Sequence, residues 1–419
     1  MFHYRLIYSL ALLIFFPIII IYLIILALKD NELYSIKDRF GINLILKNEN
    51  SVCVHCASLG EINGAKRLIG EIKKNNTTLI STNTFSGKKR AKELFPDLDV
   101  IYFPLDYVIF VKNWLKFLNI QSMIIYETEV WPNFYKICSN KNIKIAIVNA
   151  RVKKDSYKKI IVKKLYSEAL KNCDLILCKS EYERQKYLNF NINEKNLLTA
   201  GNLKYSYNAS HSDEENPVGI KKYFLMASTH DPDEANFSRA ILDLVNNRFT
   251  TVIAPRHIAR SVKIFRYFQL KGVTPYLYSD LNRDKNLKVQ DGSILIIDKF
   301  GVLSKFYKEA KFVYVGGGFS KRGIQNIIEP SSHGKTILVG PNIDNFYEEI
   351  KNLEELKCAT IIAQKKSQED ECYRQTKIFY AMDSKVQEKN GEIGKKYNMK
   401  FHKIVTEYIK ILQTKKIIN

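Results

Sequence analysis

Acidic side chains stand at a position where they could take a proton from a hydroxyl group. Glu61 follows the strand-like run 52–56 and begins a stretch whose apolar residues recur at helical spacing. A carboxylate at that turn is a candidate general base, and Gly60 beside it lets a ligand approach the backbone. Because a helix N-terminus lowers the pKa of a carboxyl group, a base for neutral pH also needs apolar surroundings. Alternatively, Glu61 only stabilises its helix end.

A second acidic pair follows the apolar run 123–126. Glu127 and Glu129 are two residues apart, so their side chains leave an extended segment on the same side. Their place beside an aromatic residue at a strand end favours a site, although an ion pair at the sheet edge is the alternative. Lys204 is the candidate cation from the hinge between two halves of the chain, unless it is only solvated.

Basic and hydroxyl groups follow two apolar runs in the second half. Thr229 and His230 come after the run 222–227, and Arg256 and His257 come after the next one. The guanidinium of Arg256 suits a phosphate, since it can donate two parallel hydrogen bonds.

A glycine-rich loop, Gly316 to Gly318, follows the apolar run 311–315. Such a loop exposes backbone N–H groups to an anion, and the helix after it would add its positive end. Glu329 follows and could accept hydrogen bonds from ribose hydroxyls. The spacing fits neither the P-loop nor the G-x-G-x-x-G fingerprint, so neither an ATPase of that type nor a standard dinucleotide fold is indicated.

Alternating strands and helices must hold these residues. Continuous apolar runs separated by helix-compatible stretches predict parallel sheets covered on both faces. We expect an α/β protein with two Rossmann-like lobes and a ligand cleft between them. The expected strands are 52–56, 78–81, 100–103, 123–126, 144–148 and 174–178, then 222–227, 250–254, 274–278, 293–297, 311–315 and 336–339.

The first segment carries no charge between Leu6 and Leu28. At about 1.5 Å rise per residue it is long enough to span a bilayer core of roughly 30 Å, so we expect a single-pass transmembrane helix. A cleaved signal peptide is the alternative. Lysine and arginine are more frequent after the span than before it, which predicts a cytoplasmic body.

The chain is long and basic. Its 419 residues suggest two or three domains, and a net charge of +22 indicates an anionic partner. Seven scattered cysteines give no disulfide framework, and the Cys53–Cys56 pair is expected to be structural. A nucleic-acid reader motif is not apparent, nor is a ligand cluster that calls for a metal or cofactor.

Taken in chain order, these motifs resemble the Kdo (3-deoxy-D-manno-octulosonic acid) transferases, which are membrane-anchored GT-B glycosyltransferases of lipopolysaccharide biosynthesis. The segments that carry the resemblance are 55–61, 81–84 with Gly87, 126–133, 149–151, 201–204, 227–230, 255–257 and 326–330.

The resemblance implies transfer of Kdo from CMP-Kdo to the 6'-hydroxyl of lipid IVA with inversion, at the cytoplasmic face of the inner membrane. Glu61 would be the general base, and Glu129 with Lys204 would stabilise the transition state, Glu127 being close enough to be confused with Glu129. The remaining expected substrate contacts are those to CMP: Arg256, His257, Asn326, Ile327, Ile328 and Glu329.

One motif departs from the family. Phe300, Gly301 and Val302 take the place of its Met-Gly-Glu nucleotide loop, so a backbone contact survives there and a glutamate contact does not. Basic residues near the span would draw the phosphates of lipid IVA, unless they form a solvated helix face: Lys37, Arg39, Lys88, Lys89 and Arg90.

The expected organisation is then an anchor and two working domains. The ranges are 1–30 for the anchor, 31–206 for an acceptor-binding domain, 207–219 for a linker or surface loop, 220–382 for a CMP-sugar-binding domain and 383–419 for a C-terminal helical segment. Two alternatives stay open: a GT-B transferase with another nucleotide sugar and a lipid-linked acceptor, or a membrane-tethered two-lobed solute-binding protein.

Overall fold

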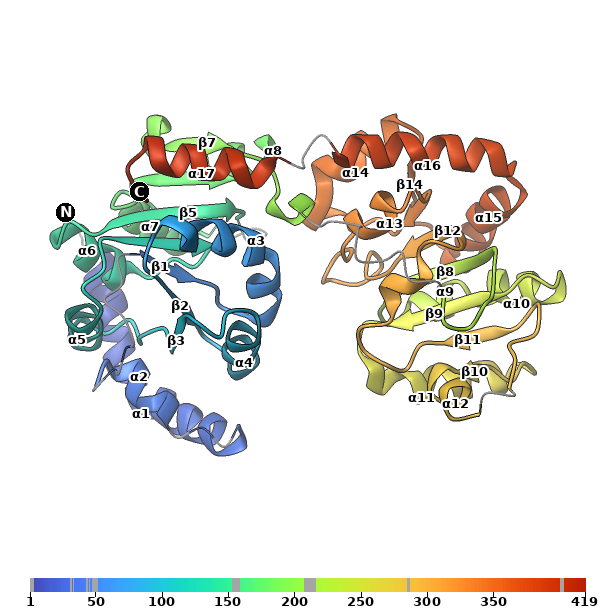
Figure 1. Cartoon of the computed structure of the whole chain (residues 1–419), viewed down its shortest axis with the longest axis horizontal. Coiled ribbons are helices and arrows are strands. Elements are labelled where there is room, and N and C mark those ends of the chain that lie inside the picture. The colour runs from blue at the N-terminus through green and yellow to red at the C-terminus, as the bar shows by residue number, and fades with distance from the viewer. Residues whose placement is uncertain are drawn as a thin grey trace. The chain divides into compact units, whose positions relative to one another are not determined.

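The computed structural model divides the chain into two compact units (Figure 1). Unit 1 comprises Met1–Ser206 with Lys403–Asn419, and unit 2 comprises Tyr207–His402. The structure describes residues 4–30, 32, 34–42, 44, 46, 52–152, 159–206, 216–284, 287–399 and 403–419. Most of the expected linker, 207–215, lies outside the described residues.

The strands of unit 1 form one parallel sheet in the order β3-β2-β1-β4-β5-β6-β7. Nearly all their side chains are buried, as continuous apolar runs in a doubly covered sheet require. The bounds are β1 Val52–His55, β2 Thr78–Thr82, β3 Asp99–Tyr102, β4 Ser122–Tyr126, β5 Lys144–Ala150, β6 Leu175–Cys178 and β7 Leu197–Thr199.

Helices connect these strands and cover the sheet. In α3 the buried side chains recur three and four residues apart, which places one apolar stripe against the sheet. The helices of unit 1 are α1 Tyr4–Lys29, α2 Tyr34–Phe40, α3 Leu59–Asn75, α4 Phe85–Leu94, α5 Val108–Leu118, α6 Pro132–Asn140, α7 Ile160–Leu170, α8 Glu181–Leu188 and α17 Ile404–Thr414, with 3-10 turns η2 Glu194–Asn196 and η3 Leu203–Ser206.

Unit 2 repeats this architecture with the parallel order β10-β11-β9-β8-β12-β13-β14. Its strands are β8 Tyr223–Thr229, β9 Thr251–Pro255, β10 Tyr276–Leu277, β11 Ile294–Ile296, β12 Ala310–Val315, β13 Ile337–Val339 and β14 Ala359–Ile361. Its helices are α9 Asp233–Asn236, α10 Ser238–Asn246, α11 Ser261–Gln269, α12 Tyr278–Arg283, α13 Ile328–Ser332, α14 Tyr347–Glu355, α15 Gln368–Ala381 and α16 Ser384–Met399, with η5 Ile258–Arg260, η6 Leu303–Phe306 and η7 Asp344–Phe346.

The expected α/β class and the predicted strands are confirmed, with three differences. The short edge strands β7 and β14 were not expected. Only residues 276 and 277 of the run 274–278 are strand, because α12 begins at the next residue. The segment 383–419 contains two helices that belong to different units: α16 belongs to unit 2, and α17 returns to unit 1.

The first helix, α1, lies along unit 1 beside α2, α6 and α7 (Figure 1). It is long and apolar enough to cross a membrane, with a mean hydropathy of 3.2 over its best window and 11% of that window buried. Pro17 lies inside the helix without ending it.

Candidate active site

Strand order in unit 1 reverses between β1 and β4, which are neighbours at the centre of the sheet. Ligands of open α/β sheets bind at the carboxyl ends of the strands beside such a reversal. Glu61 follows β1 and Glu127 follows β4, so the two carboxylates stand on either side of this switch point.

Glu61 lies in the first turn of α3, where backbone and side chain both hold it. The amide of Ala57 donates to its Oε2 at 2.7 Å, and the Ser58 hydroxyl donates to its Oε1 at 3.3 Å. Burial raises the pKa of Glu61 to about 7, and the negative charges of Glu127 and Glu129 add to that rise against the opposing amide bond. Burial and the neighbouring carboxylates therefore bring the pKa of Glu61 into the range that a general base needs near neutral pH.

Glu127 is a carboxylate within ion-pair distance of Lys204. Its backbone has a φ of 59°, a left-handed conformation that is uncommon outside glycine and often marks functional sites. Arg151 donates from Nε to its Oε2 at 2.8 Å, and the Nζ of Lys204 lies 3.9 Å from its Oε1. Glu129 accepts a bond from Asn83 at 3.4 Å. The sequence placed both acids near Lys204 without separating them.

Lys204 is positioned by its neighbours in the chain and by β5. The amide of Leu203 donates to the Asn149 side chain at 3.0 Å, and the Asn149 amide group donates to the Tyr126 hydroxyl at 3.1 Å. Gly201, at φ +89°, accepts a bond from the hydroxyl of Tyr408 on α17 at 2.7 Å. The C-terminal helix of unit 1 thus supports the segment that carries the lysine.

Arg151, which sequence reasoning used only as part of a motif, is held by Thr128. The Thr128 hydroxyl hydrogen-bonds the Arg151 carbonyl, and the Arg151 amide donates back to it at 3.3 Å. The loop after β4 is thereby tied to the end of β5. The Arg151 guanidinium lies within hydrogen-bond distance of Glu127 in this arrangement.

In unit 2 the strand order reverses between β8 and β12, and a buried aspartate occupies that switch point. Asp233 accepts bonds from the amides of His230 at 2.7 Å and Gly317 at 2.9 Å, and from the Tyr314 hydroxyl at 2.7 Å. Burial raises its pKa to about 6 against these three bonds. Through these bonds Asp233 joins the His230 turn to the glycine loop.

The expectation that the glycine loop offers its amides to an anion is wrong for Gly316 and Gly317. The Gly316 amide donates to the Ala227 carbonyl at 2.9 Å, and the Gly317 amide is taken by Asp233. The glycines are needed for close packing instead: a Cβ on Gly318 would lie 2.6 Å from the Gly340 Cα. The following helix α13 has only five residues, so it adds little positive end.

Because the amides of Gly316 and Gly317 are occupied, positive charge near the strand ends of unit 2 comes from side chains. Arg256 and His257 follow β9, as expected. The Nε2 of His257 lies 3.1 Å from the Nη1 of Arg322, and the His230 and His257 ring centroids are 5.8 Å apart. Asn345 fixes this arrangement, since its side-chain amide donates to the Arg322 carbonyl at 2.9 Å. No signal in the sequence indicated this contact, because Arg322 lies 65 residues from His257 in the chain.

The remaining nucleotide positions lie on two turns. Phe300 is 72% exposed, Gly301 has a φ of +80°, and Val302 is buried before η6. Asn326 caps α13 by accepting from the Ile328 amide at 3.0 Å, and its side-chain amide donates to Glu329 at 3.2 Å.

Burial raises the pKa of Glu329. The Ile327 and Ile328 side chains are buried, so only their backbone is available to a ligand.

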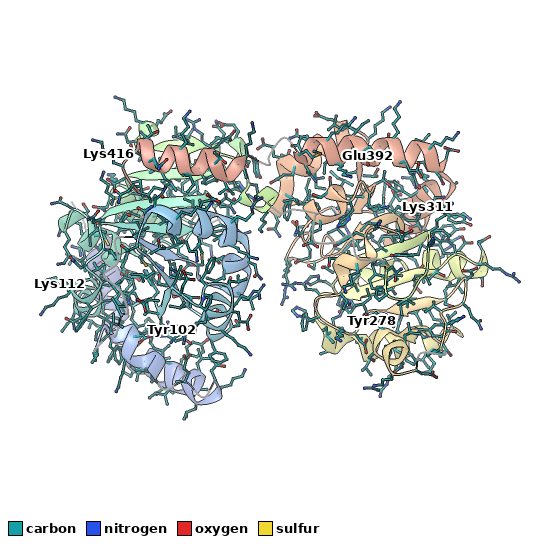
Figure 2. All side chains as sticks on the ribbon, viewed as in Figure 1. Tyr102, Lys112, Tyr278, Lys311, Glu392 and Lys416 are labelled. Atoms are coloured by element: carbon teal, nitrogen blue, oxygen red, sulfur yellow. The ribbon has the colours of Figure 1, made fainter. Side chains whose placement is uncertain are left out.

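Two of the basic residues expected to draw lipid phosphates are already engaged. Lys88 is buried and pairs with Glu32 at 3.0 Å and Asp38 at 3.4 Å, and Arg39 donates to the Asn83 carbonyl at 2.6 Å. Both cations stack on the Tyr102 ring, which is labelled in Figure 2. That part of the expectation is wrong, because these cations hold α2 and the preceding turn to β3.

Cysteine and metal chemistry have little support. All seven cysteines are free and buried, and burial raises the pKa of Cys53 to about 12. Across the described ranges, no group of three or more His, Cys, Asp or Glu side chains could hold a metal ion.

Comparison with known proteins gives the class first. The structure of UDP-GlcNAc 2-epimerase from Neisseria meningitidis matches with a TM-score of 0.60 at 11% identity, over 87% of this chain and all (100%) of that one. A glycosyltransferase from Rickettsia africae matches with 0.57 at 12% identity, over 88% and 99%. At these identities the likeness shows the fold alone, and with the two parallel sheets that fold is GT-B.

Sequence comparison then shows which proteins the chain is similar to. Residues 34–207 match the model of the 3-deoxy-D-manno-octulosonic-acid transferase (kdotransferase) family. A bifunctional glycosyltransferase/methyltransferase of Fusobacterium nucleatum is 29% identical over 74% of this chain and 50% of its own length. Kdo transferases of Rickettsia prowazekii and Rickettsia bellii are 28% and 26% identical, over 70% and 97% of this chain and 64% and 98% of their own.

The chain thus spans between half and two thirds of the first two relatives. Together these matches agree with the resemblance to the Kdo transferases expected from the motifs.

Proposed function

We propose that the protein transfers Kdo from CMP-Kdo to a hydroxyl group of lipid IVA, with inversion at the anomeric carbon. The observation that carries the proposal is Glu61: a carboxyl group at the switch point of unit 1 whose pKa is raised to about 7. A hydroxyl acceptor needs a base of this kind, whereas a solute-binding protein needs none.

The transfer step is a displacement in which Glu61 takes the proton. The acceptor oxygen bonds to the anomeric carbon while the bond from that carbon to the phosphate oxygen breaks, and the electron pair leaves with CMP. The acceptor proton passes to Glu61. Lys204 stabilises negative charge that develops in the transition state, and Glu127 with Arg151 fixes the position of its ammonium group.

Unit 2 binds the donor through its nucleotide. Arg256 and His257 are assigned to the CMP phosphate, and Asn326 and Glu329 to the ribose, with backbone contacts from 327–328 and 300–302. Val302 offers no carboxylate, so the ribose and base depend on the other groups. Within the chain, 31–206 is then the acceptor-binding domain and 220–382 the CMP-sugar-binding domain.

The acceptor explains the apolar first helix and the excess of positive charge. Lipid IVA carries two phosphates and lies in a membrane, and the chain has a net charge of +22. We place the body on the cytoplasmic face of the inner membrane, with α1 in contact with lipid.

Incubating the purified protein with CMP-Kdo and lipid IVA, with mass spectrometry of the lipid, tests this proposal. The expected product is lipid IVA heavier by whole Kdo residues, with no product from UDP-sugars. Product from a UDP-sugar alone would point to another GT-B transferase. Ligand binding without any transfer, unchanged by Glu61→Gln, would point to the solute-binding alternative.

A further inference from the structure

The first helix is tied to unit 1 at its N-terminal end by polar groups. The Tyr4 hydroxyl accepts a bond from Lys164 at 2.8 Å, and the Arg5 amide donates to Glu168 at 3.2 Å. The side chains of Arg5 and Ser9 lie 3.3 Å and 3.1 Å from the Asn133 side-chain oxygen. These bonds join the start of α1 to α6 and α7.

The middle and the end of the helix lie on the same unit. The Tyr107 hydroxyl donates to the Leu12 carbonyl at 2.5 Å, and the Phe16 ring lies 5.3 Å from the Tyr107 ring. Leu23 and Ala27, both within the last two turns of the helix, are buried. The inward residues recur at three- and four-residue spacing along the helix, so α1 lies flat on unit 1 over about 39 Å.

The opposite face of the helix is apolar along its whole length. Ile7, Ile14, Ile21 and Leu28 are seven residues apart and are 47%, 74%, 59% and 63% exposed. Helices α5 and α7 of the same unit also carry exposed apolar side chains: Val108, Ile109, Phe117, Ile160 and Ile161.

Between α1 and α5 lies a groove of about 400 Å³. It is lined mainly by apolar groups, among them Leu12, Leu13 and Ile109, and Lys112 stands at it. Lys112, labelled in Figure 2, and Lys116 are exposed on α5 and suit anionic headgroups. Apolar area beside cations matches the chemistry of a bilayer surface.

We infer that α1 lies in the plane of the membrane instead of crossing it, and that the apolar face of α1, α5 and α7 rests in the same leaflet. A crossing helix would carry Arg5 across roughly 30 Å of hydrocarbon, away from Asn133 and Glu168. An in-plane helix keeps every contact given above and still places its outward face in lipid. Both ends of α1 are then on the side of unit 1, so the single-pass topology expected from the sequence is replaced.

Depth measurements along one helix face test this inference. Four single-cysteine variants, Ile7→Cys, Ile14→Cys, Ile21→Cys and Leu28→Cys, are spin-labelled and bound to vesicles of phosphatidylethanolamine and phosphatidylglycerol. The native cysteines are buried, and the labelled wild type gives the background. Accessibility to oxygen against a water-soluble nickel chelate reports depth. Leu270→Cys, at a residue of unit 2 that is 90% exposed, is the aqueous control.

Equal depth at the four positions is the result expected for an in-plane helix. Deep labels at 14 and 21 with shallow labels at 7 and 28 would overturn it in favour of a crossing helix. Shielding of all four from both probes without vesicles, with cross-links between chains, would overturn it in favour of a second copy as the occupant. Failure to bind vesicles would also overturn it. The experiment uses no substrate, so its outcome is separate from that of the transfer assay.

Discussion

An acidic residue stands at the switch point of each unit, but the two acids have different hydrogen-bond partners. In unit 1, Glu127 is bonded by cationic side chains, Arg151 and Lys204, and it acts on the pKa of Glu61. In unit 2, Asp233 accepts hydrogen bonds from two backbone amides and a tyrosine hydroxyl. These bonds join the glycine loop to the turn at His230. A similar reversal of strand order therefore surrounds a carboxylate with cationic side chains in one unit and with backbone amides and a hydroxyl in the other.

Removing the carboxylate of Glu61 tests the catalytic half of this comparison most severely. Glu61→Gln keeps the size and the hydrogen-bonding capacity but cannot take a proton, so we expect Kdo transfer to fall by about 10²- to 10⁴-fold. Glu71→Gln, an exposed change on the same helix, is the matched control and should leave the rate near normal. If Glu61→Gln transferred Kdo at the control rate, Glu61 would not be the general base.

Lys204→Ala should have the next largest effect. Loss of a preorganised positive group usually costs about 10²- to 10³-fold in turnover, and it should lower kcat more than it raises the KM for the donor. Lys171→Ala changes an exposed lysine of the same unit and serves as the control. A normal kcat in Lys204→Ala would mean that Glu127 and its partners are only structural.

Arg322→Ala tests the binding half of the comparison. If side chains supply the positive charge in unit 2, CMP affinity measured by calorimetry should fall about tenfold, the usual worth of one charged hydrogen bond. Lys321→Ala changes the adjacent cation, which has no hydrogen bond to His257 among the described contacts, and should bind CMP as the wild type does. Equal effects of the two variants would indicate a general charge effect without a specific position.

The two neighbouring acids should shift the pH dependence of Glu61 unequally. A nearby negative charge favours the protonated form of Glu61, so removing that charge lowers its pKa and moves the acidic limb of the rate profile to lower pH. Glu127 raises this pKa more than Glu129 does. The limb should therefore move further in Glu127→Gln than in Glu129→Gln, measured as kcat/KM against pH. The reverse order would contradict the assigned geometry.

The sequence predicted the elements better than the contacts. Long buried strands are visible in the sequence as continuous apolar runs. The candidate site residues follow the carboxyl ends of these strands. The edge strands β7 and β14 are three residues each, too short for a pattern. The α1 face was hidden for another reason, since a helix that is apolar all round has no periodicity to show which side packs.

Pairings across long stretches of chain could not be predicted. The Gly317 amide donates a hydrogen bond to an aspartate 84 residues earlier in the chain. Lys88 forms ion pairs with two acids from the segment before β1. A motif indicates which groups are present, whereas the folded chain decides which of them are already bonded. For that reason the sequence overestimated the free amides of the glycine loop.

If Glu61 removes the acceptor proton with a pKa near neutrality, the pH profile of kcat/KM for Kdo transfer should report that pKa. The rate should rise with pH as Glu61 loses its proton around pH 7, and this limb should disappear in Glu61→Gln. A profile that stays flat across neutral pH, or the same limb in Glu61→Gln, would contradict it.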